Sequence, residues 1–155
     1  MFKLQEGLGL EFLPTASTAH SAGFDVRSTK KIEVFPGDTV MVPTGVFIDQ
    51  EIISNSNLFG FSDFASSHYF ALHIRSGLAA KGLMLANGVG VIDLDYEDEI
   101  CALIHNPFGH DKQKFSINVG DRIGQLVLAY HGGRLLDDFR KESARSGGFG
   151  STGVA

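Results

Sequence analysis

Residues 70–82 read Phe-Ala-Leu-His-Ile-Arg-Ser-Gly-Leu-Ala-Ala-Lys-Gly and combine two patterns that decide the fold class. Apolar side chains stand at every second position from Phe70 to Ile74, as in a half-buried strand. A brief helical turn over residues 78–81 follows, because alanine favours helix and Gly82 ends it. The stretch predicts a strand that passes directly into one turn of helix.

The same alternation recurs on both sides of this stretch, at Ile32 and Val34 and again at Phe115, Ile117 and Val119. Turn signals, each expected to reverse the chain, stand between the strands. They are Pro36-Gly37-Asp38, Pro43-Thr44-Gly45, Asn106-Pro107-Phe108-Gly109 and Val119-Gly120-Asp121. Many short strands with frequent turns predict an all-β sandwich or jelly roll.

The length of 155 residues suits one domain, and the 43% hydrophobic and 20% charged content is that of a folded globule. A net charge of -5 argues against a general nucleic-acid binder, which needs clustered lysine and arginine to displace counterions from phosphates. We expect any polyanionic ligand to be met by a local group of cationic side chains.

Cys101 is the only cysteine, so the chain has no internal disulfide, and a reducing compartment is expected. Neither a basic region followed by an apolar run near the start nor a long uncharged stretch elsewhere predicts membrane insertion. These features predict a cytoplasmic protein without a membrane partner. The histidines have no metal-binding spacing and are interpreted as structural or surface residues: His20, His68, His73, His105, His110 and His131.

Two stretches depart from the rest of the chain. Residues 54–70 mix serine and asparagine with six aromatic or large apolar side chains, so we expect something to bury those rings. Residues 145–153 are rich in glycine and serine, which on composition alone predicts a flexible end.

The chain lacks a phosphate-binding GxxxxGK[ST] loop, a GxSxG elbow and a Cys/His nucleophile pair, so its chemistry must rest on carboxylates. Asp93 and Asp95 are two residues apart and would point to one face of a strand. Such a pair could hold a metal or share acid and base roles, or could be ordinary surface charge near a turn. Likewise, Arg75-Ser76-Gly77 could be a simple turn or could bind phosphate, and Gly120-Asp121-Arg122 is most simply a turn.

Five segments in order resemble the five motifs of the dUTPase family, and together they span residues 22–153. They are Ala22-Gly23-Phe24-Asp25-Val26-Arg27-Ser28, Arg75-Ser76-Gly77-Leu78-Ala79-Ala80-Lys81-Gly82, Asn87-Gly88-Val89-Gly90-Val91-Ile92-Asp93-Leu94-Asp95-Tyr96, Gly120-Asp121-Arg122-Ile123-Gly124-Gln125-Leu126 and Gly147-Gly148-Phe149-Gly150-Ser151-Thr152-Gly153. The resemblance implies a jelly-roll homotrimer, with a domain at residues 1–143 and an arm at 144–155 that closes over a site on another subunit.

The resemblance also implies the reaction, hydrolysis of dUTP to dUMP and pyrophosphate, which limits uracil incorporation into DNA and supplies dUMP for dTMP synthesis. It makes Asp93 the base that deprotonates a water attacking the α-phosphorus. It implies Mg²⁺ on the triphosphate oxygens, held by Asp25 through water. Arg75, Ser76 and Gly77 would contact the phosphates.

The remaining substrate contacts are implied in the same way. A hairpin opened between Asn87 and Val91 would receive uracil, and Tyr96 would lie against the deoxyribose, while Asp95 is interpreted as a structural ion-pair partner. The other substrate-binding positions are Gly90, Ile92, Cys101 on the return strand, Gln125, Arg145, Phe149, Gly150 and Ser151.

Three features depart from the family pattern. The fifth motif is one residue shorter between Arg145 and Phe149, and Asp98 replaces a glycine after Tyr96. Residues 54–70 are longer than the corresponding family connection and are interpreted as an insertion that packs locally or serves another partner.

Other functions stay open on sequence alone. The sibling enzyme dCTP deaminase shares the fold and would release ammonia from dCTP. A binding or regulatory protein could use the same trimer and its aromatic insertion. A purely structural jelly roll would explain the strands but not the coexistence of the five segments.

Overall fold

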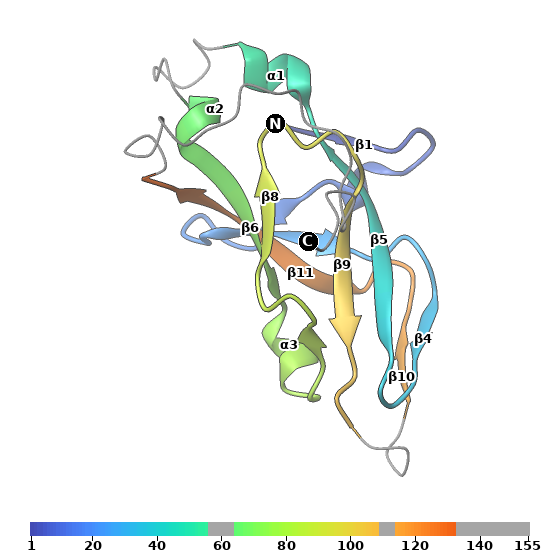
Figure 1. Ribbon diagram of the computed structural model, residues 1–155. Helices are drawn as coiled ribbons and strands as arrows, with labels where there is room; N and C mark the ends of the chain where they lie inside the picture. Colours follow the sequence, from blue (N-terminus) through green and yellow to red (C-terminus); the bar gives the residue numbers. More distant parts are fainter. Residues whose placement is uncertain (56–63, 109–113, 133–155) are drawn as a thin grey trace.

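The computed structural model describes residues 1–55, 64–108 and 114–132 and shows two facing β-sheets with a short two-stranded ribbon (Figure 1). The four-stranded sheet has the order β1 (Phe2–Leu4), β5 (Thr39–Ile48), β9 (Ile100–His105), β7 (Met84–Leu85). The five-stranded sheet has the order β2 (Thr15–Ala16), β3 (Gly23–Arg27), β11 (Arg122–Tyr130), β6 (His68–Ile74), β8 (Gly90–Asp93). The predicted all-β class is confirmed.

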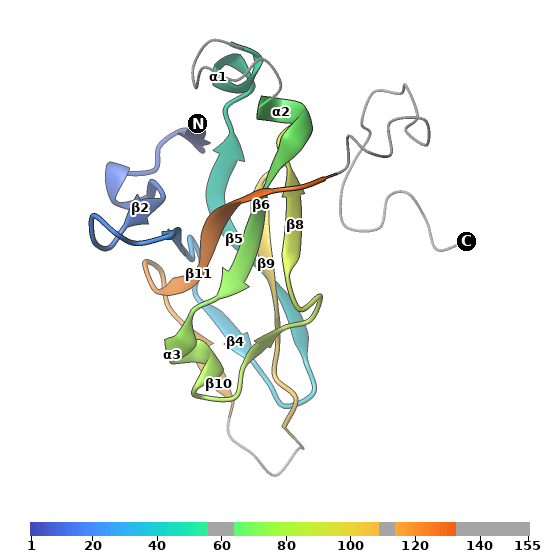
Figure 2. The ribbon, with the colours of Figure 1, turned by 90° about the vertical axis from the view of Figure 1, so that its left-hand side faces the viewer.

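The ribbon pairs β10 (Phe115–Ile117) with β4 (Ile32–Val34), and a 3-10 turn at Leu10–Phe12 follows β1. Three short helices sit at the ends of the sandwich. Figure 2 shows α1 (Gln50–Ser54) and α2 (Phe64–Ser67) at one end and α3 (Ser76–Ala79) near the ribbon at the other.

The core lies between the sheets, where each strand contributes every second side chain. Val26, Leu72 and Leu126 point inward from the five-stranded sheet, and Val42 and Ile104 face them from the four-stranded sheet. The alternation that predicted β4, β6 and β10 therefore reflects burial on one face. Val119, predicted to continue the last of these strands, lies beyond it and is 57% exposed.

Of the aromatic side chains in residues 54–70 that the structure describes, Phe64 and Phe70 are buried and Tyr69 is partly exposed. Phe64 on α2 and Phe70 on β6 are 8% and 0% exposed, as the composition predicted. Residues 56–63 lie outside the described part of the chain, so the insertion itself stays a prediction.

The prediction of a chain reversal at Pro43-Thr44-Gly45 was wrong, because β5 runs straight through these residues with an irregularity in its pairing to β9. The buried Thr44 hydroxyl donates to the Ile100 carbonyl at 2.5 Å and accepts from the Val46 amide at 3.2 Å. The Gly45 amide donates to Glu99 Oε1 at 2.5 Å. Side chains thus satisfy backbone groups displaced by the bulge, and the strand continues.

Gly45 should be harder to replace than Gly37, although both have positive φ angles, +67° and +85°. A Cβ on Gly37 would enter open space, whereas a Cβ on Gly45 would collide with Leu8 and stand 3.1 Å from Thr29 Cγ2. We expect Gly37→Ala to lower the free energy of unfolding by about 1–2 kcal/mol through backbone strain alone, and Gly45→Ala to lower it by roughly 1–3 kcal/mol more through overpacking. Urea unfolding of both variants at one protein concentration checks this, and equal losses would contradict it.

Candidate functional site

Asp25 on β3 is a buried acidic group with several partners. Its carboxylate is 5% exposed and forms ion pairs with Arg75 at 2.5 Å and Arg122 at 3.2 Å. It also accepts a hydrogen bond from Ser17 Oγ at 3.1 Å. Because two guanidinium groups share one carboxylate, this cluster has a net charge of +1 and guanidinium donors to spare for an anion.

The second predicted motif lies beside this cluster. Arg75 is the N-cap residue of α3 and its amide donates to the Ile123 carbonyl at 3.1 Å, which ties it to β11. Ser76 and Gly77 follow in the first turn of α3 and are exposed. The N–H groups of a first helical turn have no acceptor within the helix, so they can donate hydrogen bonds to an external oxygen.

Gln125 completes this end of the site. It pairs across the sheet with Asp25, so the two side chains share a face. A Cβ at Gly23 would come within 2.7 Å of Gln125 Oε1, so the glycine leaves the space that the amide occupies. The structure therefore brings Asp25, Arg75 and Gln125 to the same end of the sheet.

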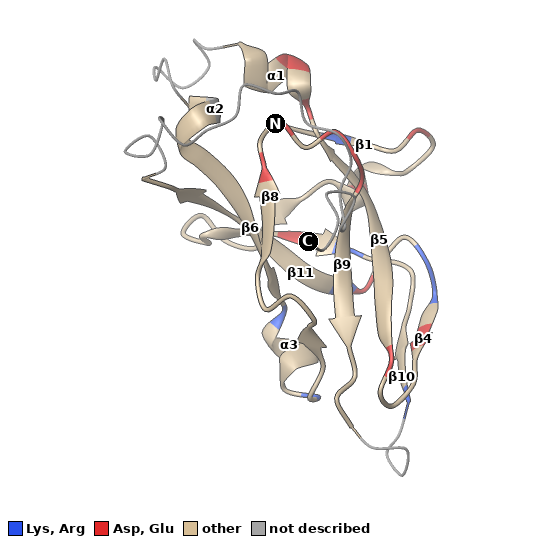
Figure 3. Cartoon of the chain, viewed as in Figure 1, with Lys and Arg blue, Asp and Glu red and all other residues tan. Residues whose placement is uncertain are grey.

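Asp93 lies on the same outer face but at the far end of the sheet. Gln125 is opposite His73 on β6, whereas Asp93 is opposite Tyr69, four residues further along that strand. Four residues extend about 13 Å along a strand and three strand spacings add about 14 Å across, so Asp25 and Asp93 are on the order of 20 Å apart in one chain. Figure 3 shows acidic residues at the end of β8 and on α1, and a basic residue where α3 begins.

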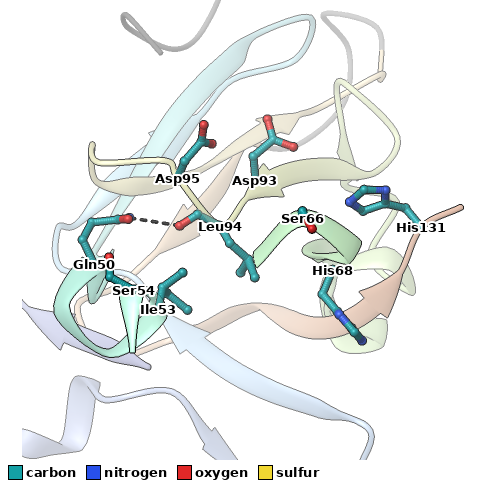
Figure 4. Close-up of a pocket in the computed structure, with 9 residues that line it drawn as sticks. All are labelled: Gln50, Ile53, Ser54, Ser66, His68, Asp93, Leu94, Asp95 and His131. Atoms are coloured by element: carbon teal, nitrogen blue, oxygen red, sulfur yellow. Dashed lines mark hydrogen bonds between the residues drawn. The ribbon is translucent and has the colours of Figure 1, made fainter. Parts of the chain in front are cut away.

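A pocket of about 610 Å³ adjoins Asp93 between the end of β8 and helices α1 and α2. Figure 4 shows the Asp93 and Asp95 carboxylates on the same side, with the buried Leu94 side chain directed away from them. β8 ends at Asp93, and Asp95 lies in the turn that follows. The two carboxylates therefore share one side, as predicted, although only Asp93 lies in the strand. The pocket is lined by Gln50, Ile53, Ser54, Ser66, His68, Asp93, Leu94, Asp95 and His131.

The segment predicted to be a base-receiving hairpin is instead the connection from β7 to β8, because β7 pairs with β9 in one sheet and β8 pairs with β6 in the other. Asn87 is exposed at its tip, Gly88 has a φ of +70°, and Val91 is 60% exposed. Gly90 and Ile92 are buried. These two positions could reach a ligand chiefly through backbone groups.

Cys101 was predicted to lie on a strand that returns alongside β8, and this prediction was wrong. It lies on β9 in the other sheet, where it pairs with Pro43 of β5, because the turn after β8 carries the chain from one sheet to the other. Burial raises the pKa of its thiol to about 12, and the neighbouring Glu99 adds to the effect.

Tyr96 is 5% exposed and belongs to the hydrophobic core, while its hydroxyl donates to the Glu99 carbonyl at 3.4 Å. Only a small edge of this side chain could meet a sugar. The predicted arm at 144–155, with Arg145, Phe149, Gly150 and Ser151, lies outside the described residues.

Within the described ranges, no group of three or more His, Cys, Asp or Glu side chains could hold a metal ion. The same residues contain no helix long and apolar enough to cross a membrane. The only carboxylate predicted to contact a metal, Asp25, already has donors on both oxygens.

Comparison with known proteins gives a consistent answer. The dUTPase family model matches residues 12–74 and 65–153, which is nearly the whole chain. The chain belongs to the dUTPase family. A deoxyuridine 5'-triphosphate nucleotidohydrolase of Hahella chejuensis is 37% identical over 97% of the chain and 93% of the relative.

Solved dUTPase structures share the jelly-roll fold. That of Streptococcus mutans has a TM-score of 0.64 at 31% identity, covering 83% of this chain and 94% of the other. A mutant dUTPase from phage phi11 of S. aureus, described with a structural Mg(II) ion, has a TM-score of 0.64 at 19% identity and covers 84% and 91%. At that identity the phage enzyme supports the fold alone.

Several residues around this dUTPase-family site were not predicted as site residues, among them Ser17, Arg122 and Gln50. Ser17 and Arg122 both contact Asp25, and Gln50 lines the pocket beside Asp93. Arg122 was interpreted as part of a turn, and nothing in its spacing reveals that it reaches a carboxylate 97 residues away in the chain. Only the strand pairing of β11 with β3 brings it there.

The raised pKa of Cys101 predicts an unreactive thiol. A thiol with a pKa of about 12 instead of 9.0 has roughly a thousandfold less thiolate at pH 8, so iodoacetamide should label the native protein at least ~100-fold more slowly than the urea-unfolded chain. Between about pH 9 and pH 12 the folded state keeps the thiol proton that the unfolded state loses. The contribution of this thiol to the stability of the fold therefore falls as pH rises from about 9 towards 12. Mass spectrometry of timed labelling checks the rate. Equal rates for the native and unfolded chains would contradict the prediction.

Proposed function

We propose that the chain hydrolyses dUTP to dUMP and pyrophosphate, limiting uracil incorporation into DNA and supplying dUMP for dTMP synthesis. The observation that carries the proposal is a family match extending through every predicted motif, together with the cationic cluster of Arg75 and Arg122 at Asp25. The relatives named above are nucleotidohydrolases of deoxyuridine 5'-triphosphate.

In the proposed reaction a water oxygen attacks the α-phosphorus, and the bond from that phosphorus to the bridging oxygen breaks. Asp93 takes the proton from the water, and pyrophosphate leaves with the electron pair of the broken bond. Its position at the end of β8, exposed beside a pocket, supports this role because the carboxylate can be approached from solvent. Asp95 is assigned a structural role.

Phosphate recognition is assigned to the opposite end of the sheet. Arg75, the start of α3 at Ser76 and Gly77, and the Gln125 amide offer donors suited to phosphate oxygens. Because Asp25 holds Arg75 in the free chain, a phosphate would compete with that carboxylate for the guanidinium. The cluster's extra positive charge favours this exchange.

Base and sugar recognition are assigned to the connection between β7 and β8. The Asn87 amide and backbone groups from Gly90 to Ile92 would bind the edge of uracil, in a space too narrow for the thymine methyl group. Tyr96 would exclude a 2′-hydroxyl through its exposed edge. Phe149, Arg145, Gly150 and Ser151 of the arm would close the site, with Cys101 contributing through its backbone.

Magnesium is proposed to enter with the triphosphate, where it would offset negative charge on the phosphate oxygens. Asp25 fits a water-mediated role better than direct coordination. Its oxygens are held by Ser17, Arg75 and Arg122, and direct coordination would break those interactions. An exchange of Arg75 from Asp25 to a phosphate would free one oxygen to hold a metal-bound water.

A homotrimer is proposed because one chain holds Asp93 and Arg75 too far apart to act on one phosphorus atom. Between these ends, the outer face of the five-stranded sheet presents Ala71, Val91, Val127 and Ala129. An apolar face that joins two halves of a site is suited to contact with another copy. The cytoplasmic location and an extra partner for residues 54–70 stay predictions.

The first test measures pyrophosphate release from dUTP, dTTP, dCTP and UTP, with and without Mg²⁺. We expect turnover of dUTP alone, and a loss of about 10²–10⁴-fold in kcat for Asp93→Asn because a general base contributes that much. Asp98→Asn, another exposed acidic position near the same turn, is the matched control and should keep its activity. Ammonia release from dCTP would indicate the deaminase instead, and a folded oligomer without turnover would favour a binding protein.

A second test asks whether one site draws on two chains. Asp93→Asn and Arg75→Ala chains are each expected to be nearly inactive. After equal mixing, unfolding and refolding, about a quarter of the sites should combine an intact Asp93 with an intact Arg75 from different chains. The assembly should have three times the chain mass of 16.7 kDa by light scattering. A mixture no more active than its parents would contradict shared sites.

A further inference from the structure

The turn after β8 carries both Asp93 and Tyr96. It closes with a hydrogen bond from the Tyr96 amide to the Asp93 carbonyl at 3.1 Å. Leu94 and Tyr96 insert their side chains into the core and are 2% and 5% exposed. The side chains therefore anchor the turn to the fold, but they do not by themselves fix the orientation of its peptide planes.

Gln50, the first residue of α1, contacts this turn from outside the five motifs. Its Nε2 donates to the Leu94 carbonyl at 3.0 Å and to the Tyr96 carbonyl at 3.3 Å. Figure 4 shows the side chain extended from α1 to Leu94. Both carbonyl oxygens can only accept hydrogen bonds, so the amide nitrogen of Gln50 must face them. The two hydrogens on that nitrogen match the two carbonyl oxygens.

The helix that carries Gln50 is itself held in place. Asp49 caps α1 by accepting from the Glu51 and Ile52 amides at 3.2 and 3.4 Å. The Asp49 amide donates to the Met1 carbonyl at 2.9 Å, and Ile53 packs into the core. A five-residue helix has little stability of its own, so these contacts give Gln50 its fixed position.

We propose that Gln50 is a positioning residue, which acts through the 94–96 backbone to hold Asp93 and Tyr96 where the reaction needs them. This inference rests on the proposed hydrolysis of dUTP. The two hydrogen bonds orient the 94–95 and 96–97 peptide planes, one within the turn that begins at Asp93 and one directly after Tyr96. A displacement of about 1 Å at a reacting group can cost on the order of 100-fold in rate, so their effect on turnover exceeds their effect on folding.

The test compares the full-length chain with Gln50→Leu, which removes the donors, and Gln50→Glu, which keeps the shape but turns an acceptor towards both carbonyls. Glu51→Gln is the matched control, since Glu51 is the next residue of α1 and is exposed. The measurements are kcat and KM for dUTP, the ratio of kcat/KM for dUTP to that for UTP, and hydrogen exchange of the 93–97 amides.

Both Gln50 variants should lower kcat by about 10–100-fold while KM changes less than about threefold, because substrate binding is assigned largely to other groups. The preference for dUTP over UTP should fall, since Tyr96 is displaced as well. Exchange should rise in the 93–97 segment and stay unchanged in β9. The control should match the unmodified chain in all measurements.

The outcomes separate two failures. An unmodified chain that does not hydrolyse dUTP overturns the proposed function itself. An active chain whose Gln50→Leu and Gln50→Glu variants keep kcat within twofold overturns the positioning role alone. If Gln50→Leu does not fold, the near-isosteric Gln50→Glu decides: normal kcat contradicts the inference, and a selective loss of kcat supports it.

Discussion

The two-residue period of a β-strand is the constraint on which the arrangement of the site depends. It directs Asp25, Gln125 and Asp93 to one outer face of a single sheet, because each lies in register with β6 residues of the same parity. The same register keeps Asp93 far from the other two. A rigid sheet cannot bring its own ends together, which is why the proposed reaction uses another copy of the chain.

The net charge of the side chains differs between the two ends of the five-stranded sheet. At one end, the buried carboxylate of Asp25 is outnumbered by Arg75 and Arg122, and the surplus positive charge favours an anion. At the other, Asp93 and Asp95 lie beside a pocket whose described lining contains no lysine or arginine. In the proposed reaction, attraction of phosphate requires positive charge and removal of a proton requires a free carboxylate. The sheet separates the groups assigned to these two tasks.

The sequence predicted the parts of the fold that local pattern controls. Alternation located β6, and glycine with its neighbours located the turn at Gly37. The bulge in β5 was missed because a proline and a glycine close together resemble a turn, while the groups that keep the strand intact, such as the Glu99 carboxylate, are distant in sequence. Helices α1 and α2 were missed for a related reason. They are five and four residues long, too short for periodicity to show.

Family motifs identified Asp25 and Arg75, but the contacts of Arg122 and Gln50 follow only from tertiary structure.

The place of β11 within its sheet bears on how the chain is made. This strand is the last one that the structure describes, yet it lies in the middle of the five-stranded sheet, between β3 and β6. While the ribosome is still synthesising the chain, β3 and β6 have no partner on the edges that β11 will occupy, and the inner face around Leu126 is incomplete. The five-stranded sheet must therefore wait for β11 to emerge before β3 and β6 can be joined. Long sequence separation slows such pairing, and open strand edges attract other chains in the meantime. Nascent chains truncated before residue 122 are thus the form of this protein most exposed to aggregation and to chaperones.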